Sequence, residues 1–237
     1  MRCTTMSMLC FVTLILTATF TLPPSSALSK SPSFESAGLT QYQHQRPTIH
    51  TGCGSVIDDL ERMADTSSHG MTNRGDHGNW AHELTHYVNS MFRRAASREH
   101  GGKWNGFYAG DGWALTLPEP NIKLMDIAKE IPKADRGRAY QTYLINQQKW
   151  WNSEPLYILD EATAAASGLR YHTSSRTTDK GREALLSEWI CYSSALVRAV
   201  QKRDPGYSHL AELEAFVRWH NARCFYLITQ HQALVKP

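Results

Sequence analysis

The fold of this chain is decided by residues 79–92, NWAHELTHYVNSMF. Apolar residues in and just after this stretch recur at steps of three and four, which is the pattern of an amphipathic helix with one buried face. They are Ala81, Leu84, Val88, Met91 and Ala95. We therefore expect a long helix whose apolar face packs against the core.

The neighbouring residues set the expected ends of this helix. Residues 75–78, GDHG, favour a loop, and Asn79 is a suitable N-cap because its side chain can accept a hydrogen bond from a free backbone amide. The helix is expected to continue to Arg98 and to stop at Gly101-Gly102.

Two histidines and a glutamate lie beside the apolar face. His82 and His86 are four residues apart, so their rings lie one turn apart on the same side and can bind one metal ion together. Zinc binds histidine nitrogen at roughly 2.0–2.1 Å. Glu83 lies next to the pair and could act as a general base toward a water molecule at the metal. The pattern predicts a catalytic zinc site.

Residues 82–86, HELTH, resemble the HExxH motif of the zincin metallopeptidases at all three defining positions. The resemblance implies a peptidase with Zn²⁺ on His82 and His86. One zincin branch has a glycine three residues, and a third histidine six residues, after the second histidine. Asn89 and Phe92 occupy those positions here, so this branch does not fit. The gluzincin branch instead takes a glutamate from a later helix.

Residues 159–168, LDEATAAASG, are the best place for such a glutamate, and Glu161 is the expected third ligand. Ala164 and Ala165 lie one turn beyond it, and their small side chains would let this helix approach the HExxH helix closely. The stretch is gluzincin-like in general character but lacks the thermolysin-type neighbours, since Asp160 precedes the glutamate. Asp160 could accept the second N–H of a ligand histidine. Alternative ligands are Glu188, His100 and His172.

Peptide hydrolysis also benefits from a donor to the oxyanion of the tetrahedral intermediate. Tyr157, one helical turn before Glu161, is the first candidate for this catalytic role, and Tyr171 and His172 are the next. An extended peptide substrate could also pair with an edge strand of the sequence's best hairpin, residues 104–117.

The rest of the sequence predicts an α+β fold that is predominantly helical, with a zincin-like helical core and a small β-hairpin beside the HExxH helix. Residues 104–108 and 113–117 alternate around the turn 110–112, GDG, as a hairpin does. Helical patterns cover residues 55–65, 122–131, 137–151, 156–169, 182–202 and 208–232.

The N-terminus has the order of a secretory signal peptide. Arg2 is followed by the apolar run 8–22 and by residues 23–27, PPSSA, with small residues before an expected cut after Ala27. An uncleaved anchor is the alternative, but the run is short for a membrane span of about 20 residues. We expect residues 1–27 to be removed, residues 28–52 to be a flexible segment and residues 53–237 to form a single metallopeptidase-like domain, secreted or periplasmic.

Composition limits the partners of the chain. The 25 Lys and Arg against 22 Asp and Glu give a formal charge of +3, which argues against dedicated nucleic-acid binding. No stable membrane insertion is expected after cleavage of the signal peptide. Cys53, Cys191 and Cys224 would remain, and Cys191 and Cys224 either bridge two helices or stay as free thiols.

Three functions are compatible with these features. The first is an exported zinc-dependent hydrolase, most simply a peptidase that acts on a peptide or protein substrate. The second is a catalytically inactive zincin-like binding or scaffold protein. The third is a zinc amidase that acts on a non-protein amide, because the motif does not by itself choose the bond that is cleaved.

Overall fold

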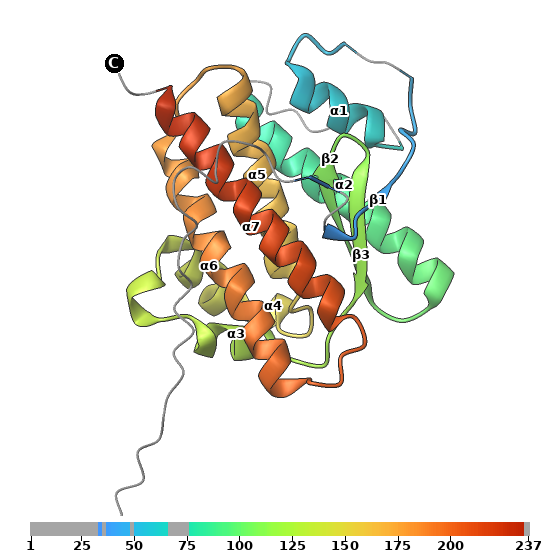
Figure 1. Ribbon diagram of the computed structural model, residues 1–237, viewed down its shortest axis with the longest axis vertical. Helices are drawn as coiled ribbons and strands as arrows, with labels where there is room; N and C mark the ends of the chain where they lie inside the picture. Colours follow the sequence, from blue (N-terminus) through green and yellow to red (C-terminus); the bar gives the residue numbers. More distant parts are fainter. Residues whose placement is uncertain (1–32, 35–36, 48–49, 66–75, 235–237) are drawn as a thin grey trace, which may run out of the picture.

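The computed structural model describes residues 33–234 apart from 35–36, 48–49 and 66–75 (Figure 1). The expected signal peptide and residues 28–32 lie outside the described residues. None of the helices in the described part of the chain is both long enough and apolar enough to cross a membrane.

The HExxH stretch forms helix α2 (His77–His100), one of the three longest helices. Its N-cap is Asp76, whose side chain accepts a hydrogen bond from the amide of Asn79 at 2.9 Å. The prediction that Asn79 is the N-cap was therefore wrong, because the helix begins earlier and Asn79 lies in its first turn. At the other end Gly101, with φ of 71°, terminates the helix as expected.

The predicted hairpin is present as β2 (Trp104–Gly110) and β3 (Trp113–Pro118). A two-residue strand β1 (Thr40–Gln41) pairs with β3, so the antiparallel sheet has the order β1-β3-β2. The sequence indicated no regular structure in the region where β1 forms. Asp111 has φ of 53° and Gly112 of 82°, the left-handed backbone that a tight hairpin turn requires.

The outer edge of β2 is covered by α2. The amide of Trp104 donates to the Ser97 hydroxyl at 3.2 Å, and the amide of Tyr108 donates to the Asn89 side chain at 2.7 Å. Because these amides already have partners, β2 is not free to pair with a substrate in the way that the sequence suggested.

The remaining elements are helical, which confirms the predominantly helical α+β fold. Figure 1 shows α5, α6 and α7 running side by side, with the hairpin beside α2. Besides α2, the α-helices of the described residues are α1 (Ser55–Met63), α3 (Leu124–Glu130), α4 (Gln148–Trp151), α5 (Tyr157–Ser174), α6 (Lys180–Arg203) and α7 (Leu210–Ala233). A 3-10 turn (Lys133–Asp135) and a π-helical segment (Tyr140–Asn146) precede α4, so the helix expected over 137–151 is divided.

Two apolar clusters form the core. The larger joins α5, α6 and α7 to the hairpin through buried residues such as Leu159, Trp189 and Phe216. The smaller lies among α1, α2 and the hairpin and includes Ile57, Leu84 and Tyr108. Helix α2 is packed between the sheet and α5, and this packing places its His82-His86 face against α5.

Helices α2 and α5 approach each other closely at Gly168, next to the end of the helix expected over residues 156–169. A Cβ on Gly168 would lie 3.0 Å from the carbonyl oxygen of Gly78 and 2.9 Å from a guanidinium nitrogen of Arg182. Helix α5 therefore continues through Gly168 to Ser174, because this glycine serves close packing rather than termination.

Candidate metal centre

The crossing of α2 and α5 brings together the three metal ligands expected from the sequence. His82 and His86 project from α2 and Glu161 from the first turns of α5, and one ligand atom from each lies within 4.8 Å of the other two. The two Nε2 atoms are 3.1 Å apart. The Glu161 carboxylate lies 3.7 Å from Nε2 of His82 and 3.8 Å from Nε2 of His86.

This arrangement fits a bound metal ion. Tetrahedral ligands at about 2.0–2.1 Å from zinc lie roughly 3.3 Å from one another. The two Nε2 atoms are slightly closer than this, and each lies slightly farther than this from one oxygen of Glu161, Oε2 for His82 and Oε1 for His86. Oxygen Oε2 of Glu161 is buried without a hydrogen-bond partner. A buried carboxylate oxygen with no donor is costly, and a cation would satisfy it. The group could therefore hold a metal ion.

Burial and neighbouring charges shift the pKa values of the two histidines in opposite directions. Burial, followed by the charge of His86, lowers the pKa of His82 to about 3. Burial also opposes a charge on His86, but the hydrogen bond and charge of Asp160 outweigh it and raise the pKa of His86 to about 9. A neutral His82 can accept a hydrogen bond from a protonated His86, so metal binding must displace a proton held between these rings.

The pKa of the Glu161 carboxyl also differs from the ordinary value of a glutamate. Its pKa is raised to about 7, mainly by burial, against the opposing charge of His86 and a hydrogen bond from Tyr157. A positive ion beside this carboxyl would favour its ionised form. Metal binding near neutral pH would therefore release a proton from Glu161.

A polar network behind His86 fixes the orientation of its ring. Nδ1 of His86 lies 3.0 Å from Oδ2 of Asp160, as the sequence suggested for this aspartate. The Asn89 amide donates to Oδ1 of Asp160 at 2.6 Å and to the Thr163 hydroxyl at 3.0 Å. Arg93 contributes an ion pair to Asp160 at 3.6 Å. Because Asp160 accepts the Nδ1 proton, Nε2 of His86 is directed toward the other ligands.

The sequence interpretation missed Asn89 as part of the site. His82, His86 and Asn89 are spaced by four and three residues, so they share one face of α2. Asn89 is fully buried. A polar residue in phase with two ligand histidines is the signal that would have identified it.

Two tyrosines lie beside the glutamate. The Tyr157 hydroxyl donates a hydrogen bond to Oε1 of Glu161, and its ring stacks on Trp151 with centroids 4.0 Å apart. Tyr143, in the π-helical segment, lies close enough that burial and then the Glu161 charge raise its pKa. Tyr157 is thus a direct partner of a metal ligand, and its predicted role as an oxyanion donor stays a prediction.

Glu83 remains exposed on the outer side of the histidine pair. No described partner engages its carboxylate in a hydrogen bond or an ion pair, yet its charge acts on His86, Tyr143 and Glu161. A solvent-facing carboxylate beside three inward-facing ligands is suitably placed to exchange protons with a molecule held at the centre.

The residues considered as alternative ligands or oxyanion donors make contacts away from His82, His86 and Glu161. Glu188 accepts hydrogen bonds from two backbone amides and from the Tyr192 hydroxyl, and His100 lies against Trp104 at the end of α2. The Tyr171 hydroxyl contacts His77, while His172 faces Thr177 and Asp179. Within the described residues, only His82, His86 and Glu161 form a group with metal-ligand spacing.

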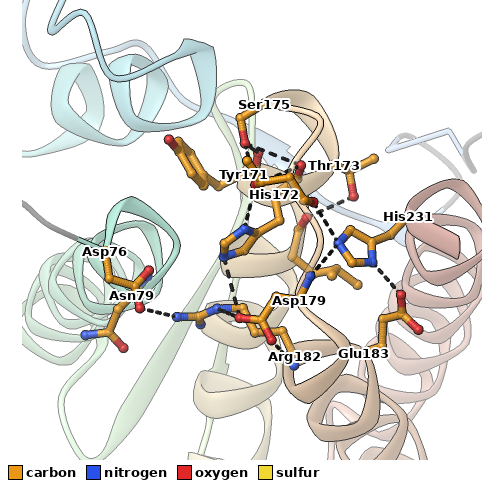
Figure 2. Close-up of polar contacts among 12 residues, drawn as sticks. Asp76, Asn79, Tyr171, His172, Thr173, Ser175, Asp179, Arg182, Glu183 and His231 are labelled. Carbon is orange, nitrogen blue, oxygen red and sulfur yellow. Dashed lines mark hydrogen bonds and ion pairs between the residues drawn. The ribbon is translucent and has the colours of Figure 1, made fainter. Parts of the chain in front are cut away.

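A second polar cluster, shown in Figure 2, holds the start of α2 against α6. Arg182 pairs with the N-cap Asp76 at 3.3 Å and with Asp179, the N-cap of α6, at 3.2 Å. His231 from α7 is completely buried; it accepts from the Asp179 amide at 3.1 Å, and its Nδ1 faces the Glu183 carboxylate. These contacts tie the N-terminal ends of α2 and α6 together beside the metal centre.

Compared with known protein families, with curated proteins and with solved structures, the chain matches none of them.

The three described cysteines are free thiols, so the bridge considered for Cys191 and Cys224 is not formed. The chemistry that this chain can perform is indicated by the residues at the α2–α5 crossing.

Proposed function

We propose that this protein is an exported zinc-dependent hydrolase that cleaves peptide bonds. The observation that carries the proposal is the convergence of His82, His86 and Glu161, with an unpartnered buried oxygen on Glu161 and a solvent-facing Glu83 beside them. Two nitrogen ligands and one carboxylate are the donor set of one class of catalytic zinc site.

Zinc held by these three residues would supply a Lewis acid that polarises the scissile carbonyl and lowers the pKa of water. Glu83 would then take a proton from the attacking water and deliver it to the departing amine, which matches its exposed position. Asp160 would hold the tautomer of His86, and Tyr157 would hold the Glu161 carboxylate.

Export is the second part of the proposal. It is supported by the order of Arg2, the apolar run 8–22 and the small residues Ser25 and Ala27, which is that of a cleaved signal peptide. The substrate would then be a peptide or protein outside the cytoplasm.

The first test measures zinc in purified residues 28–237 for the wild type, Glu161→Ala and Glu83→Gln, together with hydrolysis of a quenched-fluorescence peptide library. We expect about one zinc per wild-type chain by the three-ligand rule, retained in Glu83→Gln and largely lost in Glu161→Ala. Hydrolysis should be present in the wild type and absent from both variants.

Glu99→Gln provides the matched control, since Glu99 is an exposed glutamate on the same helix. It should keep both zinc and activity. A wild type that binds no zinc when supplied with it would reject the metal centre. Undiminished hydrolysis in Glu83→Gln would reject the proposed base. Zinc binding without hydrolysis of any peptide would reject the peptidase in favour of a binding protein or an amidase that acts on a non-protein amide.

A further inference from the structure

A cavity of about 530 Å³ adjoins the candidate metal centre. It lies between the π-helical segment and the first turns of α6, and its wall includes Tyr143. Because the charge of Glu161 acts directly on Tyr143, this tyrosine belongs to both the cavity and the surroundings of the metal ligands. The volume is in the range of pockets that hold small ligands or single side chains with their neighbours.

The acidic groups of the cavity wall are already engaged. The Glu188 carboxylate accepts hydrogen bonds from the amides of Arg138 at 3.2 Å and Ala139 at 2.9 Å, and from the Tyr192 hydroxyl at 2.8 Å. Asp179 caps α6 and pairs with Arg182, as Figure 2 shows. The oxygens of both carboxylates are therefore engaged in holding the wall together.

One basic group of the wall is not engaged in this way. Arg138 is exposed, and no hydrogen bond or ion pair involves its guanidinium among the residues that the structure describes. Its positive charge nevertheless reaches the Tyr143 hydroxyl. Arg182 lines the same wall but is paired with Asp76 and Asp179, which leaves Arg138 as the cation of the wall that has no ion pair among the described residues. A guanidinium with free donors is suited to bind a carboxylate with two parallel hydrogen bonds.

We infer that this cavity binds a carboxylate-bearing part of the substrate. Arg138 would hold the carboxylate, and Tyr143 lies between this cavity and the metal centre. The carboxylate is either an acidic side chain next to the cleaved bond or the C-terminal carboxylate of a peptide. Ala139 and Leu185 provide apolar wall for the methylene groups that carry it. The position of the cleaved bond rests on the proposed function, whereas carboxylate binding itself does not.

The test uses four alanine-based hexapeptides and the zinc-loaded Glu83→Gln protein, so that binding is measured without turnover. Three peptides are capped at both ends and carry Glu, Gln or Lys at the centre, and the fourth carries Gln and a free C-terminal carboxylate. Fluorescence anisotropy gives each Kd. We expect a carboxylate-bearing peptide to bind about tenfold more tightly than its neutral counterpart. The capped Glu peptide and the uncapped peptide distinguish the two sources of the carboxylate.

Variants at Arg138 then test whether this residue causes the preference for carboxylate-bearing peptides. Arg138→Gln should abolish it and Arg138→Glu should shift it toward the Lys peptide, a reversal that a merely structural role would not produce. Arg218→Gln, an exposed arginine on α7 outside the cavity wall, should leave it unchanged. Equal binding of all four peptides, no binding of any, or a preference that survives in Arg138→Gln would overturn the inference.

The same peptides given to the wild type separate the two proposals. Cleavage with no preference for a carboxylate rejects the cavity assignment and leaves the hydrolase standing. Carboxylate-dependent binding through Arg138 without cleavage supports the cavity assignment and rejects the peptidase.

Discussion

His86 and Asp160 are joined across the α2–α5 crossing, with Nδ1 of the histidine 3.0 Å from Oδ2 of the aspartate. Asp160 precedes Glu161, so one turn of α5 supplies both a candidate metal ligand and the group that orients another candidate, His86. Asp160 is itself held by Asn89 and by Arg93 and is almost fully buried. Burial of a carboxylate in such a network requires that all its partners be present.

Replacing Asp160 by Asn should therefore weaken zinc binding. The amide cannot stabilise the ring of His86 as a carboxylate does, and outer partners of metal ligands are typically worth about 10–100-fold in affinity. Competition with a chromogenic zinc chelator at constant pH gives the dissociation constant. Glu212→Gln, an exposed acid on α7, should change nothing. An unaltered zinc affinity in Asp160→Asn would show that the contact does not support the ligand.

Tyr157→Phe distinguishes a positioning role from a catalytic one. Its hydroxyl donates to Glu161, so we expect zinc affinity to fall by about tenfold, as for other outer partners, with hydrolysis recovering at saturating zinc. Tyr207→Phe removes another largely buried tyrosine hydroxyl, which donates to the Pro118 carbonyl, and should leave zinc affinity unchanged. Unchanged zinc affinity with kcat lowered by about a hundredfold would instead assign Tyr157 to the oxyanion.

The sequence was sufficient for features that depend on local patterns. The three- and four-residue spacing of apolar residues predicted α2 and its buried face, and Ala81, Leu84 and Val88 are fully buried. The prediction was wrong for Ala95, which is exposed while its neighbour Ala96 is buried, and Met91 is only half-buried. The four-residue spacing of His82 and His86 placed both ligands on one face. The gluzincin resemblance implied a glutamate on a later helix, and the small residues after Glu161, a local sign of close helix packing, indicated which one.

Other features depend on contacts between distant segments and could not be predicted in the same way. The Arg182–Asp76 pair joins residues that are 106 positions apart, and no local pattern relates them. Tyr143, on which the Glu161 charge acts, lies in segment 140–146, which is π-helical where a regular helix was expected. Helix α5 continues past the predicted end at residue 169 to Ser174, and the contact that requires glycine at position 168 is with Gly78 on α2, far away in the sequence.

Glu119 supports the start of α5 and should make stability depend on pH. Its carboxylate accepts hydrogen bonds from the amide of Leu156 at 3.1 Å and from the side chain of Asn105. Burial, opposed by the Leu156 amide and assisted by the charge of Glu154, raises the pKa of Glu119 to about 7. In the unfolded chain the pKa of a glutamate is about 4.3.

Between these two pKa values the folded protein keeps a proton that the unfolded chain has lost. The stabilisation by protonated Glu119 is complete below about pH 4.3 and is lost as the pH rises through about 7. Relative to Glu119→Gln, the wild type should lose about 1–3 kcal/mol of unfolding free energy between pH 5 and pH 8. Urea unfolding of both metal-free proteins measures this difference, and parallel pH profiles would contradict it.

Gly168→Ala tests whether the close crossing of α2 and α5 is what forms the metal centre. In an unobstructed helix interior this change stabilises a protein by up to about 1 kcal/mol, because alanine is the better helix former. Here the new methyl group would lie 3.0 Å from the Gly78 carbonyl oxygen, a backbone atom that cannot move alone, so the helices must separate. We expect a loss of about 1–3 kcal/mol in urea unfolding and a weaker zinc affinity, since His82 and His86 lie on one helix and Glu161 on the other. Gly206→Ala, where a Cβ meets nothing within 4 Å, should leave zinc affinity unchanged. If Gly168→Ala were as stable as the wild type and bound zinc as tightly, helix separation would not control the site.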